Sequence, residues 1–247
     1  MSEATITISA VLPMRNQAST LAATMAEYMA GISRQCPDHE IILVDDGSSD
    51  GTARQADYLA AAYDSVMVIH QPEPRGYAAA LRTAWQVARG DYIFAASISG
   101  PAGIADLPRL LAALGDNAVV VGYRARPPRT PLALIYAAAV RTILSTDLRD
   151  PAIRFSLFRS DLAELLTDDV PDGLAHAEIY ARAKQAGMPV AQVAISGRRG
   201  RVATAGAAMI ELASYRPPSG GRQGALMGAT ALLVAGGLWL MRRRSHP

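Results

Sequence analysis

The sequence predicts an α/β protein with a mostly parallel central sheet covered by helices on both faces. Short apolar runs rich in β-branched residues alternate with longer helical patterns along the chain. Half of the 247 residues are hydrophobic and 19% are charged, which is typical of a packed globular domain and excludes a disordered or fibrous chain. Because sheets of this kind bind ligands at the carboxyl ends of their strands, we expect a site at that edge.

The alternating pattern predicts each element in chain order. Strands are expected at residues 5–12, 40–44, 65–69, 92–96 and 119–122, with helices between and after them at 20–32, 51–63, 77–89 and 106–114. A Pro/Arg-rich loop then precedes a helix at 132–145, a strand at 155–158, helices at 161–166 and 175–186, and a last strand at 190–195.

The C-terminal part of the chain differs in composition from the rest. Residues 198–247 hold eight arginines and one glutamate (+7), which leaves 16 basic and 21 acidic residues (−5) before them. The uncharged apolar run 224–241 would be about 27 Å long as a helix, close to the thickness of a bilayer core. We therefore expect an α/β domain over residues 1–200, a Gly/Pro/Arg-rich linker over 201–222, and a membrane-anchor helix within 223–247.

The anchor helix is expected either to span the bilayer or to lie in its interface, and the choice stays open. Arginines beside an apolar run favour anionic lipid head groups over nucleic acid as the partner. The single cysteine, Cys36, favours a reducing compartment, and the N-terminus lacks the pattern of a secretory signal. The domain is therefore expected at the cytoplasmic face of a membrane.

The strongest motif is VDDGSSDGT at residues 44–52, directly after a predicted strand and before a helix. Carboxylates at such a position, Asp45 and Asp46, can accept hydrogen bonds from a ribose or a nucleobase. Gly47 permits a sharp turn, and Ser49 or Asp50 can cap the helix that follows. The alternative is a capped strand-to-helix turn without a ligand.

Several segments, in order, resemble glycosyltransferase family 2 with a GT-A fold, a Rossmann-like α/β architecture, and especially its dolichol-phosphate mannose synthase-like branch. The resemblance covers about residues 6 to 200. Its segments are PMRNQ at 13–17, the motif at 44–52, RGYAAALR at 75–82, GDYIF at 90–94, VGYR at 121–124, LRD at 148–150, FSLFR at 155–159, and Glu178 with AKQAG at 183–187.

The resemblance implies two groups of site residues. Four would bind the base and ribose of a nucleotide: Pro13, Asn16, Asp45 and Asp46. Three would lie near the sugar phosphate and the acceptor as the catalytic group: Arg124, Arg149 and Asp150. A guanidinium group can bind two oxygens of one phosphate at once, which agrees with a position of the two arginines near a phosphate. The alternatives are a solvated loop for Arg124 and a simple turn cap at Pro151 for Asp150.

The sequence departs from the family at the metal motif. Ser97 and Ser99 stand where the family has Asp-x-Asp, so they are expected to border the nucleotide but to be poor ligands for Mg²⁺ or Mn²⁺. We therefore expect weak or absent divalent metal binding and no cofactor. Either arginines neutralise the diphosphate in place of the cation, or the site is catalytically inactive.

Two functions from different classes follow from the resemblance. One is a transferase that moves a sugar from a nucleotide-sugar donor to a lipid-linked acceptor, such as a polyprenyl phosphate, or to another envelope acceptor. The other is a catalytically inactive GT-A module that binds a nucleotide, a lipid phosphate or a partner protein at the membrane. An NAD-dependent oxidoreductase is disfavoured, because the first strand is not followed by Gly-x-Gly-x-x-Gly. The four histidines are scattered and predict no metal site or triad.

Overall fold

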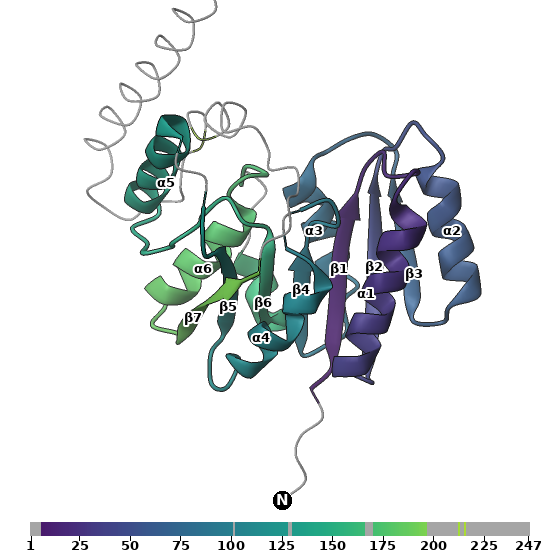
Figure 1. The fold of residues 1–247 in the computed structure, drawn as a ribbon, viewed down its shortest axis with the longest axis horizontal. Helices are drawn as coiled ribbons and strands as arrows, with labels where there is room; N and C mark the ends of the chain where they lie inside the picture. The colour runs from purple at the N-terminus through teal and green to yellow at the C-terminus, as the bar shows by residue number, and fades with distance from the viewer. Residues whose placement is uncertain are drawn as a thin grey trace, which may run out of the picture.

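The structure is a computed structural model that describes residues 6–100, 102–127, 130–165, 170–196, 212 and 215. Within these residues one seven-stranded sheet runs through the molecule in the order β3-β2-β1-β4-β6-β5-β7 (Figure 1). Its strands are β1 (Ile8–Met14), β2 (His39–Asp46), β3 (Val66–Gln71), β4 (Tyr92–Ala96), β5 (Val119–Arg124), β6 (Phe155–Arg159) and β7 (Val190–Ile195).

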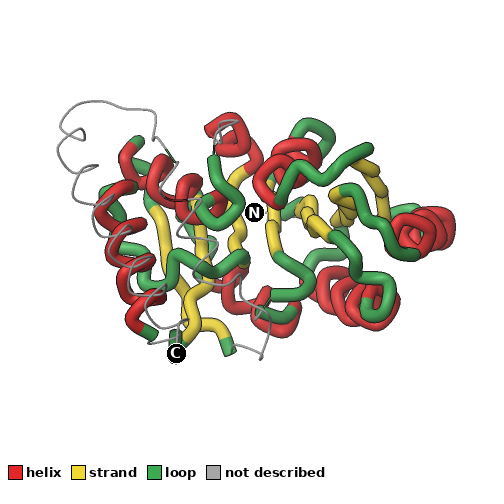
Figure 2. Tube along the Cα trace, turned by 90° about the horizontal axis from the view of Figure 1, so that it is seen from above, coloured by secondary structure: helices red, strands yellow, loops and turns green. Residues whose placement is uncertain are grey.

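Helices cover both faces of the sheet (Figure 2). They are α1 (Leu21–Gln35), α2 (Thr52–Ala62), α3 (Tyr77–Trp85), α4 (Leu107–Ala112), α5 (Pro131–Ile143) and α6 (Ala175–Gln185), with short 3₁₀ turns at Ile104–Asp106 and Ser160–Leu165. One apolar layer lies between the sheet and α3, α5 and α6. A second lies between the sheet and α1, α2 and α4. The central strands are buried on both faces, which explains their continuous apolar sequences.

The pairing of the strands fixes the position of the ligand edge. β1 pairs in parallel with β2 and β4, β2 with β3, and β5 with β7. Only β6, among the strands described, runs antiparallel to its neighbours β4 and β5. The carboxyl ends of the parallel strands therefore lie at one edge, and the start of β6 lies at that same edge.

The predicted α/β fold with a mostly parallel sheet is confirmed, with small shifts at element ends. The largest concerns the helix expected at 77–89, which ends at Trp85. The backbone N–H of Arg89 donates to Glu40 Oε1 at 2.6 Å, and that of Gly90 donates to Ser9 Oγ at 2.8 Å. These contacts lead the chain away from the helix axis and into β4.

The expected linker and anchor helix lie largely outside the described residues, so the run 224–241 stays a prediction. Within the part that is described, no helix is both long and apolar enough to cross a bilayer. Leu212 and Tyr215 are described and buried, and the Tyr215 hydroxyl donates to Glu178 Oε2 at 2.5 Å. Two residues of the expected linker thus pack on the domain.

Candidate active site

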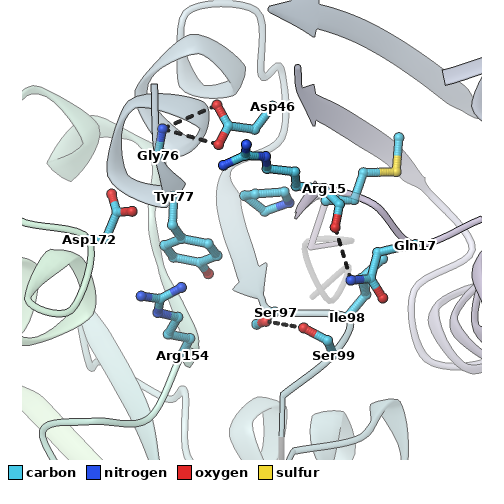
Figure 3. Close-up of a pocket in the computed structure, with 12 residues that line it drawn as sticks. Arg15, Gln17, Asp46, Gly76, Tyr77, Ser97, Ile98, Ser99, Arg154 and Asp172 are labelled. Carbon is cyan, nitrogen blue, oxygen red and sulfur yellow. Dashed lines mark hydrogen bonds between the residues drawn. The ribbon is translucent and has the colours of Figure 1, made fainter. Parts of the chain in front are cut away.

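A pocket of about 260 Å³ opens at the carboxyl edge of the sheet, between the ends of β1 and β4 and the start of α3 (Figure 3). Four of the residues that the sequence assigned to a nucleotide line it: Pro13, Asp46, Ser97 and Ser99. Its lining also includes charged and aromatic residues that the sequence did not single out as site residues: Arg15, Tyr77, Arg154 and Asp172. Segments far apart in the chain therefore meet at the expected place.

Asp46 joins the acidic turn to the start of α3. Its buried carboxylate accepts hydrogen bonds from the backbone N–H groups of Arg75, at 2.6 Å, and Gly76, at 3.1 Å. Asp172 acts on the same helix end, since its Oδ1 accepts from Ala78 N at 2.8 Å. The two carboxylates thus satisfy backbone donors that a helix start leaves unpaired.

Asp45 is buried but does not line this pocket. Its Oδ1 accepts from Ser48 N at 3.2 Å, and its Oδ2 lies 3.2 Å from His70 Nδ1 on the neighbouring strand. His70 Nε2 lies 2.9 Å from Asp57. The pKa of His70 is raised, mainly by its hydrogen bond to Asp57, although partial burial works in the opposite direction. The sequence placed Asp45 correctly at a strand end but gave no sign of this histidine pair.

Asn16 fastens the end of β1 to the acidic turn. It adopts a left-handed backbone conformation with φ 52°, which asparagine tolerates better than most residues. Its Oδ1 accepts from Ser49 N at 2.9 Å, and its own N–H donates to Ser48 Oγ at 2.9 Å. The N-cap position of α2 is Gly51, whereas Asp50, one residue earlier, accepts from the first helical N–H, that of Thr52, at 2.9 Å.

Ser97 and Ser99 lie on the turn that follows β4, with their hydroxyl oxygens 3.4 Å apart. Both are neutral donors, whereas Mg²⁺ and Mn²⁺ prefer anionic oxygens. In the described part of the chain, no group of three histidine, cysteine, aspartate or glutamate side chains is arranged to hold a metal ion. The donor chemistry at this turn therefore does not fit a divalent cation that bridges a diphosphate.

Arg154 is one of the lining residues that the sequence did not single out. Its backbone oxygen accepts from Ser97 N at 3.1 Å, and its guanidinium carbon lies 4.3 Å from the centre of the Tyr77 ring. Figure 3 shows its side chain beneath that ring, with Ser97 and Ser99 further to the right in the same pocket. At this distance the positive charge of the guanidinium is attracted to the aromatic ring.

A buried chain of hydrogen bonds holds Tyr77 in place. The Tyr77 hydroxyl lies 2.8 Å from His176 Nε2, and His176 Nδ1 lies 2.6 Å from Ser156 Oγ. Burial, reinforced by the positive charge of Arg154, lowers the pKa of His176 to about 3. The imidazole is therefore neutral near pH 7, with one nitrogen that donates and one that accepts.

The three residues expected at the acceptor side lie at the same edge but do not line the pocket. Arg124 donates from Nε to Asp150 Oδ2 at 2.6 Å and from Nη2 to Asp150 Oδ1 at 2.7 Å. Both side chains are largely buried. Arg149 donates to the Tyr123 hydroxyl at 2.7 Å, and its Cζ lies 4.8 Å from the centre of that ring. The structure thus brings Arg124 and Asp150 together in a largely buried ion pair with two hydrogen bonds.

Fold and pocket together define the class of protein, an α/β protein with the GT-A fold. Solved structures share this arrangement at low sequence identity. Glucosyl-3-phosphoglycerate synthase from Mycobacterium tuberculosis superposes with a TM-score of 0.64 and 20% identity, covering 94% of this chain and 80% of that one. Mannosyl-3-phosphoglycerate synthase from Rubrobacter xylanophilus gives a TM-score of 0.65 and 20% identity, with 84% and 73% covered.

Residues 9–96 match the model of glycosyl transferase family 2. The chain therefore carries a family 2 glycosyl transferase domain, as its motifs predicted. It is 30% identical over 201 residues to the glycosyltransferase AglD of Haloferax volcanii, a match that covers 76% of this chain and 32% of that protein. It is 28% identical over 165 residues to the undecaprenyl-phosphate mannosyltransferase of Micrococcus luteus, covering 61% and 65%. The chain thus spans less than two thirds of either relative.

Proposed function

We propose that this protein transfers a sugar from a nucleotide-sugar donor to the phosphate of a polyprenyl lipid. The observation that carries the proposal is the pocket at the carboxyl edge, where the acidic turn meets two arginines and two serines. The undecaprenyl-phosphate mannosyltransferase of M. luteus supports the acceptor class by its name. One solved structure of the M. tuberculosis synthase holds UDP-glucose and Mn²⁺, which supports the donor class.

The residues of the edge suit such a reaction. A lipid phosphate is already anionic, so its oxygen can attack the anomeric carbon of the sugar without a general base. The bond from that carbon to the diphosphate breaks, and the nucleoside diphosphate leaves with the electron pair. What the protein must supply is position and positive charge. We assign the donor to the pocket, with Pro13, Asp46, Ser97 and Ser99, and to the adjoining turn, with Asn16 and Asp45.

The acceptor is assigned to the end of β5 and the loop before β6. Arg149 and the Arg124–Asp150 pair lie there, at the same edge as the donor pocket but beyond β6. A guanidinium held on an aromatic ring, as Arg149 is on Tyr123, keeps N–H donors at its rim for a phosphate. Because the acceptor is a membrane lipid, the apolar run 224–241 is proposed to hold the domain at the cytoplasmic face of the membrane.

The test is a transfer assay with the full chain in vesicles that contain undecaprenyl phosphate. UDP- and GDP-linked glucose and mannose, radiolabelled in the sugar, serve as donors, and the lipid fraction is counted. We expect labelled lipid from at least one donor, no labelled lipid when the vesicles lack the lipid phosphate, and strong loss with Arg149→Gln. The exposed Arg34, in the last turn of α1, provides a matched control as Arg34→Gln.

A second candidate, an inactive module that binds nucleotide or lipid phosphate, is favoured by one observation. The neutral serines 97 and 99 occupy the turn where the family places its metal-binding aspartates. This candidate predicts nucleoside diphosphate binding without labelled lipid from any donor. That result would overturn the proposal of a transferase but would still support a nucleotide-binding site.

A further inference from the structure

The formal charge of the pocket lining is the starting point. Arg15 and Arg154 carry two positive charges, and Asp46 and Asp172 carry two negative charges, so the lining is formally neutral. With aspartates at positions 97 and 99 the same lining would carry −2, the charge that one divalent ion cancels. With serines there is no excess negative charge for a metal ion to cancel, and a diphosphate meets no additional repulsion.

The start of α3 already carries two carboxylates. The backbone N–H groups of Arg75, Gly76 and Ala78 donate to Asp46 and Asp172 at 2.6 to 3.1 Å, so a diphosphate there would meet negative charge. The two arginines are therefore the cationic groups of the lining that remain for phosphate oxygens. Within the described residues neither of them forms an ion pair.

Arg154 is the better placed of the two arginines. Its Cζ lies 4.3 Å from the centre of the Tyr77 ring, and within the described residues its side-chain N–H groups donate no hydrogen bond to the protein. Tyr77 is buried and held by His176, which is in turn held by Ser156. Arg15, by contrast, is exposed and has no such support. The cation is thus held in the same pocket lining as Ser97 and Ser99 before any ligand arrives (Figure 3).

From this geometry we infer that Arg154, positioned by the Tyr77 ring, takes the place of the divalent cation and binds the diphosphate of the nucleotide together with the hydroxyls of Ser97 and Ser99. The inference rests on the proposed nucleotide-sugar donor and specifies how this chain binds it. Nucleoside diphosphate binding is therefore independent of divalent ions.

The test is calorimetric titration of the full chain in detergent with UDP and with GDP, each in excess EDTA and in Mn²⁺. For the nucleotide that binds, we expect Kd values in EDTA and in Mn²⁺ that agree within about threefold. Arg154→Gln weakens binding in EDTA by about 10- to 100-fold, as loss of a charge-assisted pair of hydrogen bonds should. Arg154→Lys retains part of the affinity, and the control Arg34→Gln retains all of it.

Two outcomes separate this inference from the proposed function. If wild-type protein binds UDP or GDP only when Mn²⁺ is present, the arginine model is wrong and the transferase proposal survives. If the folded protein binds neither nucleotide in either buffer, both are wrong. Binding of the bare nucleoside serves as an internal reference, since Arg154→Gln should leave it unchanged.

The double variant Ser97→Asp/Ser99→Asp tests the charge argument directly. Two carboxylates beside the diphosphate repel it, so binding in EDTA should fall by about tenfold or more, and Mn²⁺ should restore it. A double variant that binds equally well in EDTA would contradict the charge argument.

The role of Tyr77 as a positioning residue is tested through Arg154. Tyr77→Phe keeps the ring and should keep most of the affinity, whereas Tyr77→Leu should weaken binding about as much as Arg154→Gln. In the Arg154→Gln background, Tyr77→Leu should cause no further loss, because the two residues act as one unit. Additive losses would show that Tyr77 acts by another route. Circular dichroism confirms that each variant is folded, and the Arg154 variants suffice if Tyr77→Leu does not fold.

Discussion

At the scale of single residues, two arginines at the same edge of the sheet use their guanidinium groups in different ways. The rim of the Arg124 guanidinium is paired with Asp150, at 2.6 and 2.7 Å. The Arg154 guanidinium lies 4.3 Å from the centre of the Tyr77 ring and lines the pocket without an ion-pair partner among the described residues. The first arrangement joins two segments of the protein, whereas the second presents donors to a ligand.

The Arg124–Asp150 pair is expected to matter for stability. Asp150→Ala leaves a largely buried guanidinium without its carboxylate and should lower the free energy of unfolding by about 3–5 kcal/mol. The double variant Arg124→Met/Asp150→Ala should recover part of that loss. Asp161→Ala breaks the exposed pair with Arg159 and should cost about 1 kcal/mol or less. Urea unfolding measures all three, and equal losses for the two aspartates would contradict the prediction.

His70 is expected to titrate above its usual pKa of about 6.5. Because its pKa is raised in the folded state, its stabilising effect is fully present below the unfolded pKa and is lost as the pH rises through the folded pKa. The difference in unfolding free energy between wild type and His70→Gln should therefore be larger at low pH than at high pH, by about 1 kcal/mol or less because the group is partly exposed.

The cause of the raised His70 pKa can be tested separately. NMR titration should show that Asp57→Asn lowers the pKa of His70, since the hydrogen bond to Asp57 is the main cause of the rise. Asp64→Asn, in the exposed turn after α2, should leave the His70 pKa unchanged. A wild-type pKa at or below 6.5 would show that the histidine pairs are not formed in solution.

At the scale of elements, the start of α3 depends on a glycine. Gly76 has φ +94°, and a Cβ at this position would lie 2.6 Å from the Asp172 carboxylate oxygens. Gly76→Ala should therefore destabilise the protein by about 3 kcal/mol or more and weaken nucleotide binding, because Tyr77 follows directly.

A substitution at a second glycine distinguishes the cost of backbone strain from the cost of a steric clash. Gly187, after α6, has φ +76°, and its Cβ would meet nothing within 4 Å. Gly187→Ala should cost only the strain, about 1–2 kcal/mol, and leave nucleotide binding intact. Thermal unfolding and nucleotide titration of both variants check this pair. Equal losses of stability would mean that Asp172 moves aside without a penalty.

The elements themselves were largely predictable from the sequence. β4 and β7 begin and end at the expected residues, because apolar β-branched runs bounded by turn residues are a local signal. The acidic turn was also placed correctly at the end of β2. These features depend on residues that are neighbours in the chain.

Arg154 was not predictable because its position depends on long-range geometry. β6 runs antiparallel to β4, so the residue before β6 lies at the carboxyl edge of the parallel strands. The ring that supports Arg154 comes from α3, and that ring is held through α6. The strand signal at 155–158 gives neither the direction of the strand nor these partners. The His70–Asp45 pair was missed for the same reason, since it forms across the register of β2 and β3.

At the scale of the whole molecule, the chain returns to the domain after β7. Leu212 and Tyr215 are buried, and Tyr215 donates to the buried Glu178 near the start of α6. Burial, followed by the hydrogen bond to Glu178, raises the pKa of the Tyr215 hydroxyl far above its usual range, so it stays protonated and remains a donor.

Tyr215→Phe should lower the stability of the domain by about 1–3 kcal/mol, because Glu178 then loses one of its buried donors. Thermal unfolding of the full chain measures the loss, with the exposed Tyr58→Phe as the control that should change nothing. No change with Tyr215→Phe would show that this contact is absent in solution.

The docking of Tyr215 also limits how far the active site can lie from a membrane. Glu178 is two residues from His176, whose ring is hydrogen-bonded to Tyr77 in the pocket lining. From residue 215 to residue 224 the chain takes nine steps, which reach about 32 Å at full extension. If the apolar run 224–241 enters a bilayer, the sheet edge stays close to the lipid surface, so a lipid-linked ligand would have to present its head group within that distance.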